Sequence, residues 1–401
     1  MPPAEDHPQH HNHNPHNSNS GNAGAAAASQ LQHHPPAPSL PWRCGSVATM
    51  GIVGLLCRGF LSGLSNLEVN GMDNFLRLLD ERRNVEGRER GLITVSNHVS
   101  VLDDPLLWGS LPLSYMFNPD NLRWSLASHD LAFPNKTLSL FFSLGQTLPC
   151  HRLAHSPHGG LFQPTMTQTI RLLSRAPFAK PPPPPPEKAS SVDSRDIPDP
   201  FSSAALTYTT NGHDSFPAPA AWLSRRHAWV HIFPEGKVHQ KDDRTMRYFK
   251  WGVARLILES EPCPDVVPMW VEGPDQIMHE SRTFPRFLPR VGKTVNITFG
   301  DKVDTDAVFG DLRARWRRLK ERYDGGETLE VGVLNDGLKH AKEAVELRKE
   351  CTMRVRNEVL KVRRARGLPD EDPKVGLVET WALEGPGQEG KKKDDSWVKD
   401  A

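Results

Sequence analysis

Short apolar runs that read as strands alternate with amphipathic segments that read as helices over about residues 72 to 300. This alternation restricts the fold more than any other feature. The strand-like runs are "LITVS", "RWSLAS", "QTLPC", "HAWVHIFPEG", "DVVPMWVEG" and "TVNITFG". Segments with apolar residues at helical spacing, such as "MDNFLRLLDERR" and "QPTMTQTIRLLSR", lie between them. Such alternation is typical of an α/β fold with helices on both faces of a central sheet.

Polar residues follow the carboxyl ends of three of these runs. His98 and Asp103 follow "LITVS" in the stretch "SNHVSVLDDP", Arg152 follows "QTLPC", and Glu235 and Gly236 close "HAWVHIFPEG". In open α/β sheets, ligands bind beyond the carboxyl ends of the strands. We therefore expect these residues to gather at one edge of the sheet and to form the functional site.

The five-residue spacing of His98 and Asp103 constrains the local backbone. A straight helix turns by about 100° per residue, so side chains five positions apart point away from each other. A strand that ends in a sharp turn would let them meet, with Asp104 as the N-cap of the next helix and Pro105 as its first residue. In the alternative, His98 is a polar turn residue and the aspartates compete to cap a helix. The spacing alone fits this alternative at least as well, but the other polar strand ends favour a functional pair.

A histidine held by a carboxylate is a general base whose tautomer is fixed. The chain contains no G-x-S-x-G nucleophile motif, so we expect the nucleophile to be a hydroxyl of the substrate itself. A cationic Arg152 near the base indicates an anionic, phosphate-bearing substrate. Backbone amides around Gly236 would add hydrogen-bond donors. Glu235 would either contact the substrate or hold Arg152 or a backbone turn.

Three segments differ from the alternating pattern. Residues 1–41 are a His/Asn/Ala-rich tract, and residues 177–220 include six consecutive prolines. Both are predicted to be disordered, because they bury too little apolar surface to offset the entropy of ordering. Residues 306–401 are predicted to form a charged, helical C-terminal region with basic helices. Residues 42–305 are then the folded domain that carries the site.

The apolar run "VATMGIVGLLC" stops at Arg58 and resumes as "GFLSGL". Its eleven residues are too few to span a bilayer, since about 20 are needed. We therefore expect residues 47–64 to lie in a membrane interface with Arg58 directed toward headgroups. An ordinary core helix is the alternative. The basic clusters Arg313–Arg322 and Arg354–Arg366 form either a solvated face or a surface against an anionic bilayer.

Charge and cysteine content exclude several classes of protein. The net charge is +1, which disfavours binding of nucleic acid through bulk electrostatics. The five cysteines lack paired or metal-type spacing, so we expect neither a disulfide framework nor a zinc site. We expect no other metal site and no cofactor. Glu5 and Asp6 precede the first basic residue, Arg43, which argues against an Arg-rich presequence, and no secretory signal peptide is expected.

The motifs resemble those of the glycerolipid acyltransferase family. "NHVSVLDDP", the segment from Gly145 to Arg152, "FPEG" and "VVPMWVEG" correspond in order to its four blocks, although "LPCHR" departs from the commoner second block. Longer stretches, among them "VSNHVSVLDDPLLWG", "WVHIFPEGKV" and "RYFKWGVARLI", resemble the phospholipid–lysophospholipid transacylases of that family. The resemblance covers about residues 42–300 and part of the C-terminal helix.

This resemblance implies an acyltransferase domain over residues 42–305, with a mixed central sheet and flanking helices. It implies acyl transfer between phospholipids and lysophospholipids without coenzyme A, remodelling cardiolipin from monolysocardiolipin with phosphatidylcholine as a further lipid. His98 would be the base and Asp103 its orienting partner, while Arg152, Glu235 and Gly236 would bind the glycerophosphate. The expected location is peripheral, on the mitochondrial inner and outer membranes facing the intermembrane space, with membrane protein complexes as further partners.

Two alternatives remain open. An acyl-CoA-dependent lysophospholipid acyltransferase would keep the same fold and change the acyl donor. A non-catalytic scaffold would cluster anionic lipid through its interfacial and basic helices. The scaffold is disfavoured because it has no need of His98, Asp103, Glu235 and Arg152.

Overall fold

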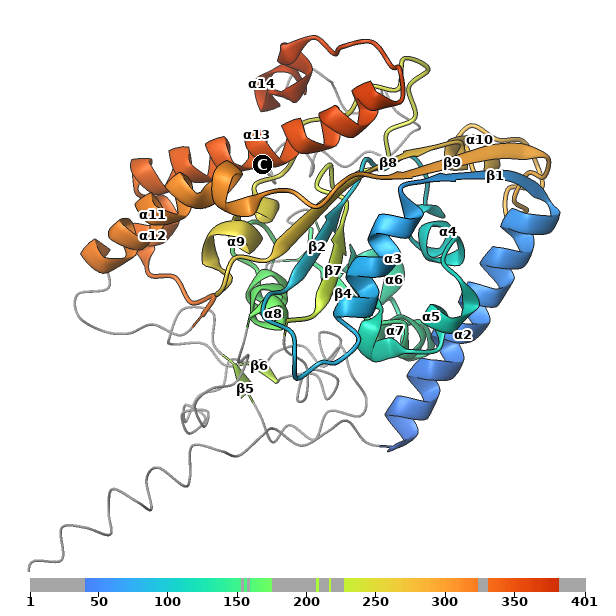
Figure 1. Cartoon of the computed structure of the whole chain (residues 1–401), viewed down its shortest axis with the longest axis horizontal. Coiled ribbons are helices and arrows are strands. Elements are labelled where there is room, and N and C mark those ends of the chain that lie inside the picture. Colours follow the sequence, from blue (N-terminus) through green and yellow to red (C-terminus); the bar gives the residue numbers. More distant parts are fainter. Residues whose placement is uncertain are drawn as a thin grey trace, which may run out of the picture. The chain divides into compact units, whose positions relative to one another are not determined.

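A seven-stranded mixed sheet forms the centre of the protein (Figure 1). The computed structural model describes residues 40–152, 155–156, 159–174, 207–208, 216–217, 227–323 and 331–381. The order across the sheet is β1-β9-β8-β2-β7-β3-β4. The strands are β1 (Ser65–Asn70), β2 (Leu92–Val95), β3 (Arg123–Ser128), β4 (Thr147–Cys150), β7 (Trp229–Ile232), β8 (Asp265–Glu272) and β9 (Lys293–Phe299).

Five neighbouring strands, β8, β2, β7, β3 and β4, run parallel, while β9 is antiparallel to β8 and β1 is parallel to β9. Leu92 of β2 lies opposite Trp229 of β7 on one side and Asp265 of β8 on the other. The predicted mixed α/β sheet is therefore confirmed. Its parallel part brings the carboxyl ends of five strands to one edge, as the sequence indicated. The edge strand β1 was not predicted.

Helices cover both faces of the sheet (Figure 1). Alternate strand residues point to opposite faces: Ile93 and Val95 belong to one buried cluster and Leu92 to the other. The helices are α2 (Leu40–Gly63), α3 (Met72–Glu81), α4 (Asp103–Gly109), α5 (Leu113–Met116), α6 (His129–Ala132), α7 (Lys136–Leu144), α8 (Pro164–Leu173), α9 (Gly252–Glu259), α10 (Pro274–Ile277), α11 (Thr305–Tyr323), α12 (Asp336–His340), α13 (Lys342–Ala365) and α14 (Val378–Trp381), with 3-10 turns η2 (Pro119–Asn121) and η5 (Pro373–Gly376).

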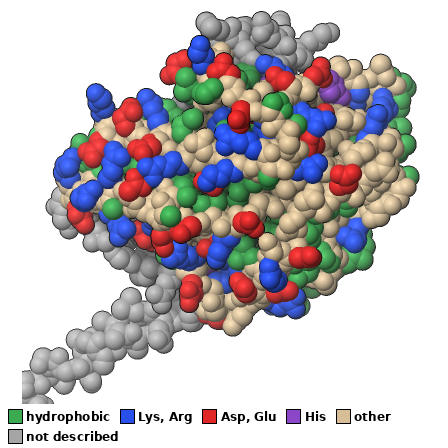
Figure 2. All heavy atoms as spheres, turned by 45° about the horizontal axis from the view of Figure 1, so that its top comes forward, with side chains coloured by type: hydrophobic (Ala, Val, Ile, Leu, Met, Phe, Trp, Pro, Cys, Tyr) green, Lys and Arg blue, Asp and Glu red, His purple; other side chains and the backbone are tan. Residues whose placement is uncertain are grey.

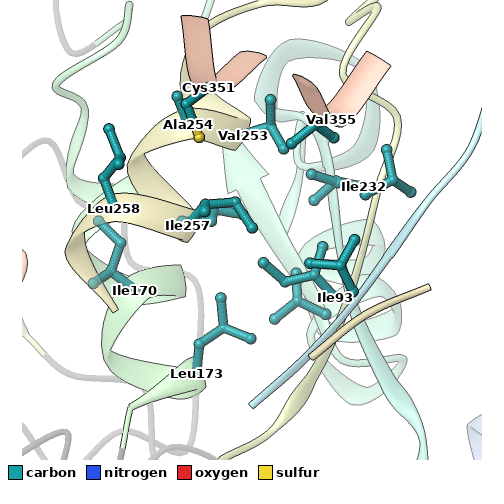
Figure 3. Packing of buried hydrophobic residues seen from close by; sticks show 14 of the residues in the cluster. Ile93, Ile170, Leu173, Ile232, Val253, Ala254, Ile257, Leu258, Cys351 and Val355 are labelled. Atoms are coloured by element: carbon teal, nitrogen blue, oxygen red, sulfur yellow. The ribbon is translucent and has the colours of Figure 1, made fainter. Parts of the chain in front are cut away.

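The helices beyond residue 305 complete the same core as the sheet. α13 packs against α9 and β8. Figure 3 shows Val355 of α13 close to Val253 of α9 and Ile232 of β7. α11 adds Phe309 and Trp316 to this cluster. The boundary expected at residue 305 therefore separates segments that share one hydrophobic core.

Many basic residues of the C-terminal helices are buried and paired. Arg313 donates to the carbonyl of Ile257 and forms an ion pair with Glu261. Arg356 and Arg363 are also buried. Figure 2 shows Asp and Glu side chains interspersed with Lys and Arg over this part of the surface. These three arginines thus do not belong to an exposed basic face, because the fold places carboxylates and carbonyls against them. Arg317, Arg318, Arg322 and Arg364 of the same clusters are exposed.

One helix boundary differs from expectation. α4 begins at Asp103, with Leu102 as its N-cap, so Asp104 lies within the helix instead of capping it. In the C-terminal region, α12 and α13 are separate helices because Ala341 between them is extended (ψ 137°).

The tract 1–41 lies outside the described residues except for its last two, which begin α2. Most of the Pro-rich segment 177–220 also lies outside them. Its described backbone forms a short antiparallel pair, β5 (Thr207–Tyr208) with β6 (Phe216–Pro217). The segment lies in the connection from α8 to β7.

Helix α2 is longer than the interfacial segment predicted from the sequence. It is 24 residues long and, within the described chain, is the one helix long and apolar enough to cross a membrane, judged by length and composition alone. Its side chains Ile52 and Leu56 are exposed, while Leu61 is buried against the protein. Arg58 donates to the carbonyls of Ser110 and Leu111, at 3.3 and 2.8 Å. The prediction that Arg58 is directed toward headgroups is therefore wrong.

Candidate active site

His98 and Asp103 meet in the turn between β2 and α4. His98 Nδ1 donates to Asp103 Oδ2 at 2.9 Å. The same carboxylate oxygen accepts the backbone N–H groups of Val99 and Ser100, at 2.6 and 2.8 Å. Asp103 therefore bends the backbone and orients the ring with one oxygen, which is how a five-residue spacing brings the two side chains together.

The imidazole of His98 is held but accessible. Its ring stacks on Phe233, with centroids 4.4 Å apart, and its side chain is 21% exposed. Because Nδ1 donates to Asp103, Nε2 is the nitrogen available to accept a proton from a substrate.

Asp103 is fully buried. Burial raises the pKa of its carboxyl group, and the hydrogen bond and charge of His98 and the amides of Ser100 and Val99 oppose that rise. Three donors converge on one oxygen, and an ionised carboxylate accepts them best. Among the described residues, no hydrogen-bond partner reaches its other oxygen, Oδ1. Asp103 thus acts as the acceptor that selects the tautomer of His98.

The backbone of His98 is anchored on both sides. Its N–H donates to Glu235 Oε1 at 2.7 Å, and its carbonyl accepts the N–H of His239 at 2.7 Å. The preceding residue, Asn97, bonds through its side-chain amide to both the N–H and the carbonyl of Val271 on β8. The turn that carries His98 is therefore tied to the two strands that flank β2.

Glu235 is a backbone-holding residue in the structure. It is buried, and its second oxygen accepts the N–H of Arg247 at 2.8 Å. Burial raises the pKa of Glu235 to about 7, opposed by the amides of Arg247 and His98 and by the charges of His98 and Arg356. Of the two roles considered from the sequence, holding a turn is the one observed. The turn it holds is that of His98.

Gly236 has a positive φ of 64°, which favours glycine. A Cβ there would come within 2.9 Å of Lys250 Cε. The amide of Gly236 donates to the carbonyl of Phe233 at 3.0 Å, so this turn uses the donor that was expected to serve the substrate.

Arg152 lies at the same edge of the sheet but is not adjacent to His98. It follows β4, which is three strands from β2, or about 14 Å at the usual strand spacing. Its Nε donates to Asp130 Oδ1 at 3.0 Å, and the two residues form an ion pair. A substrate phosphate at Arg152 would have to share this guanidinium with Asp130.

Sequence reasoning did not identify the aromatic and polar layer beneath His98. Phe233 lies between His98 and His231, whose ring meets it edge-on at 4.5 Å. His231 is buried and bonds to Thr94 Oγ1 at 2.8 Å, and burial lowers its pKa to about 3. A histidine inside the apolar run "WVHIF" was the available signal. This histidine places a neutral ring below His98.

Asp104, the second acid of the motif, is engaged elsewhere. It pairs with Arg123 and accepts the indole N–H of Trp108 at 2.8 Å. It therefore fastens α4 to β3. Within the parts of the chain that the structure describes, no group of three or more His, Cys, Asp or Glu residues could hold a metal ion.

Comparison with known proteins places this chain in a defined class. The model of the family described as Acyltransferase matches residues 66–272, a span that runs from β1 to the end of β8 and contains His98, Asp103, Arg152 and Glu235. A solved structure, the 1-acyl-sn-glycerophosphate (LPA) acyltransferase PlsC from Thermotoga maritima, aligns with a TM-score of only 0.36 and 13% identity, over 71% of this chain and 81% of that chain. That likeness is too low to bear on function.

Curated relatives narrow the class further. Tafazzin of Saccharomyces cerevisiae is 34% identical over 348 residues, which cover 84% of this chain and 81% of that protein. Tafazzin of Drosophila melanogaster is 31% identical over 278 residues, covering 69% of this chain and 56% of that protein. The chain therefore belongs to the acyltransferase family and, within it, to the tafazzins. It is an acyltransferase.

Proposed function

We propose that this enzyme transfers acyl chains from phospholipids to lysophospholipids without coenzyme A, and that it remodels cardiolipin from monolysocardiolipin. The observation that carries the proposal is the His98–Asp103 pair, with Nε2 accessible and the ring held on Phe233. Among the described residues, the only hydrogen bond of the His98 ring is to Asp103. No nucleophile among the described residues is thus activated by this base, and a substrate hydroxyl takes that part.

In this mechanism Nε2 of His98 accepts the proton of the lysolipid hydroxyl. At the same time, the oxygen of that hydroxyl attacks the ester carbonyl of the donor lipid. Asp103 remains ionised and stabilises the imidazolium that forms. The tetrahedral intermediate then expels the oxygen of the donor glycerol backbone, which recovers the proton from Nε2. One oxygen ester replaces another, so the reaction is close to thermoneutral and runs in both directions.

The nearest alternative is an acyl-CoA-dependent acyltransferase on the same fold. Coenzyme A is a polyanion, so its site requires a basic, water-facing groove. Arg152 is paired with Asp130, and Arg247 is buried with its guanidinium 4.2 Å from the ring centre of Trp381. This arrangement favours a lipid donor. The scaffold alternative is disfavoured, because a protein without activity would not need Asp103 to fix the tautomer of His98.

The proposed location is peripheral, on the mitochondrial inner and outer membranes facing the intermembrane space. Membership of the tafazzins and the exposed apolar side of α2 support it. The proposed partners are cardiolipin, monolysocardiolipin, phosphatidylcholine and membrane protein complexes.

The donor can be tested directly with purified protein in vesicles free of coenzyme A. Labelled acyl chains on phosphatidylcholine are expected to appear on cardiolipin when monolysocardiolipin is present. Label on cardiolipin is expected to move to lysophosphatidylcholine in the reverse assay. Transfer that appears only after acyl-CoA is added would overturn the transacylase proposal and support the acyl-CoA-dependent alternative.

A further inference from the structure

The loop between α10 and β9 presents apolar side chains and arginines together. We use "the 281–291 loop" for its sequence "SRTFPRFLPRV". Phe284 is 87% exposed and Phe287 is 74% exposed, and Leu288 and Val291 are exposed as well. The eleven residues include three arginines and no acidic residue. Exposing large apolar side chains in this way is costly in water, so the cluster marks a surface that is covered in use.

The arginines of the 281–291 loop brace its backbone. Arg282 donates to the carbonyls of His279, at 2.7 Å, and Arg286. Arg286 donates to the carbonyl of Glu280 at 2.7 Å, and Arg290 to that of Thr283 at 2.6 Å. The loop is therefore held in one conformation by its own side chains, with the two phenylalanines directed outward.

One end of the loop is fastened to the membrane-facing helix. Gly292 N donates to the carbonyl of Leu64, at 2.7 Å, directly after the end of α2. Leu64, Ile52 and Leu56 are exposed, so the apolar side of α2 continues toward the loop. In Figure 1, α10 and β9 lie beside the end of α2, and Figure 2 shows hydrophobic side chains next to Lys or Arg along the corresponding edge.

The other end of the loop is fastened to the catalytic turn. Gln240 donates to the carbonyl of Val99 at 2.7 Å, and its side-chain oxygen accepts the N–H of Glu280 at 2.9 Å. Val99 follows His98 directly. The loop therefore joins the base and α2.

We propose that the 281–291 loop inserts into the surface of an anionic phospholipid bilayer, with Phe284 and Phe287 in the apolar boundary and the arginines beside lipid phosphates. Aromatic side chains on a basic segment are typical of interfacial insertion. Each nearby cation adds about 1 kcal/mol of attraction to an anionic surface. Three cations without an acid, next to the apolar side of α2, favour lipid over a protein partner.

This contact would hold the entrance to His98 against the bilayer, so that lipid substrates could reach it without entering water. The choice of lipid as partner rests on the membrane attachment proposed above. The insertion of this loop can nevertheless be measured without turnover, so its failure would leave the acyl-transfer proposal intact.

The test places an environment-sensitive fluorescent amino acid at position 287 of the full chain, and in a second protein at the exposed Leu377 as a matched control. Each protein is titrated with phosphatidylcholine vesicles, with or without one fifth phosphatidylglycerol. We expect a blue shift and quenching by lipid-borne nitroxide at position 287, stronger with anionic lipid, and no change at 377. Changing Arg286→Gln and Arg290→Gln together should raise the lipid concentration for half-maximal shift about 30-fold, at about 1 kcal/mol per charge.

Two results would overturn the proposal. One is unchanged emission at position 287 although the protein floats with the vesicles. The other is a blue shift that grows with protein concentration in the absence of lipid, which would assign the loop to contact between protein molecules.

Discussion

At the scale of single residues, the proposed base, His98, is positioned through its backbone as much as through its ring. Glu235 and His239 hold the N–H and the carbonyl of His98, and Asp103 and Phe233 hold its imidazole. These contacts restrict both the backbone and the side-chain rotation of His98. This preorganisation is what a general base requires, because a small misplacement of a reacting group is costly in rate.

His98→Ala is expected to lower the rate of acyl transfer by about 10²–10⁴-fold, the usual contribution of a general base. The side chain is partly exposed, so the free energy of unfolding should change by only about 1 kcal/mol. Rates and thermal unfolding of the purified variant check both points. Asp103→Asn should also be severely impaired, because the amide can hold the ring in the wrong tautomer. Turnover like that of the wild type in His98→Ala would rule out this mechanism.

Glu235 is expected to make stability depend on pH. Its pKa is about 7 in the folded protein, against 4.5 for an ordinary glutamate. Between these values the folded state keeps a proton that the unfolded chain has lost, so the contribution of Glu235 to stability falls as pH rises from about 4.5 to 7 and is level above that. Relative to Glu235→Gln, which does not titrate, the wild type should lose about 3 kcal/mol of unfolding free energy across this window. Denaturant unfolding at pH 5 and pH 7.5 measures the difference. If the difference in unfolding free energy between the wild type and Glu235→Gln were the same at both pH values, the raised pKa of Glu235 would be contradicted.

At the scale of elements, α2 has two different sides. Its glycines allow close packing on one side, since a Cβ at Gly54 would lie 2.4 Å from the sulfur of Met116. On the other side Ile52, Leu55 and Leu56 are exposed. The helix is thus packed on the protein along one side and presents apolar side chains that are available to a membrane along the other.

Replacing Ile52, Leu55 and Leu56 together by serine is expected to weaken membrane retention at least tenfold. Burying each such side chain is worth about 1.5–3 kcal/mol, and salt does not screen this term. Vesicle flotation in high salt measures retention, with Leu377→Ser as a control for an exposed leucine elsewhere. Full retention of the triple variant in high salt would show that α2 is not the anchor.

At the scale of the whole molecule, the C-terminal region reaches the active site through the backbone. Arg356 of α13 donates to the carbonyls of Met246 and Arg247, and Glu371 accepts the N–H of Met246. Arg356 and Glu371 also form a buried ion pair. Because the N–H of Arg247 bonds to Glu235, which in turn holds His98, these contacts connect residues 356 and 371 to the base.

Glu371→Gln is therefore expected to lower kcat about tenfold while KM changes less than twofold, because it loosens the position of the base and leaves the substrate contacts in place. The control is Arg354→Met on the same helix, whose ion pairs with Asp311 and Glu350 lie toward solvent and α11. Steady-state kinetics would be measured at a temperature at which both variants are folded. Equal losses in the two variants would show that only general stability is affected.

Much of the site could be predicted from the sequence because its determinants are local. The apolar run before His98 forms the strand β2 that its pattern predicted, and a turn follows it, as the five-residue spacing requires if His98 and Asp103 are to meet. The roles of Glu235 and Arg152 could not be predicted in the same way. Each depends on a partner brought from elsewhere in the chain: the amide of Arg247 for Glu235, and the carboxylate of Asp130 for Arg152.

The sequence by itself determined the alternating α/β order and the placing of the polar residues at the carboxyl ends of the strands, because periodicity and strand direction are properties of a local segment. Only the tertiary structure decided that β1 joins the sheet beside β9, that Arg58 caps carbonyls after α4, and that Arg348, Arg356 and Arg363 of α13 are buried. A charged side chain is solvated or buried according to the groups that surround it in the fold. Those groups are distant in sequence, so no local pattern records them.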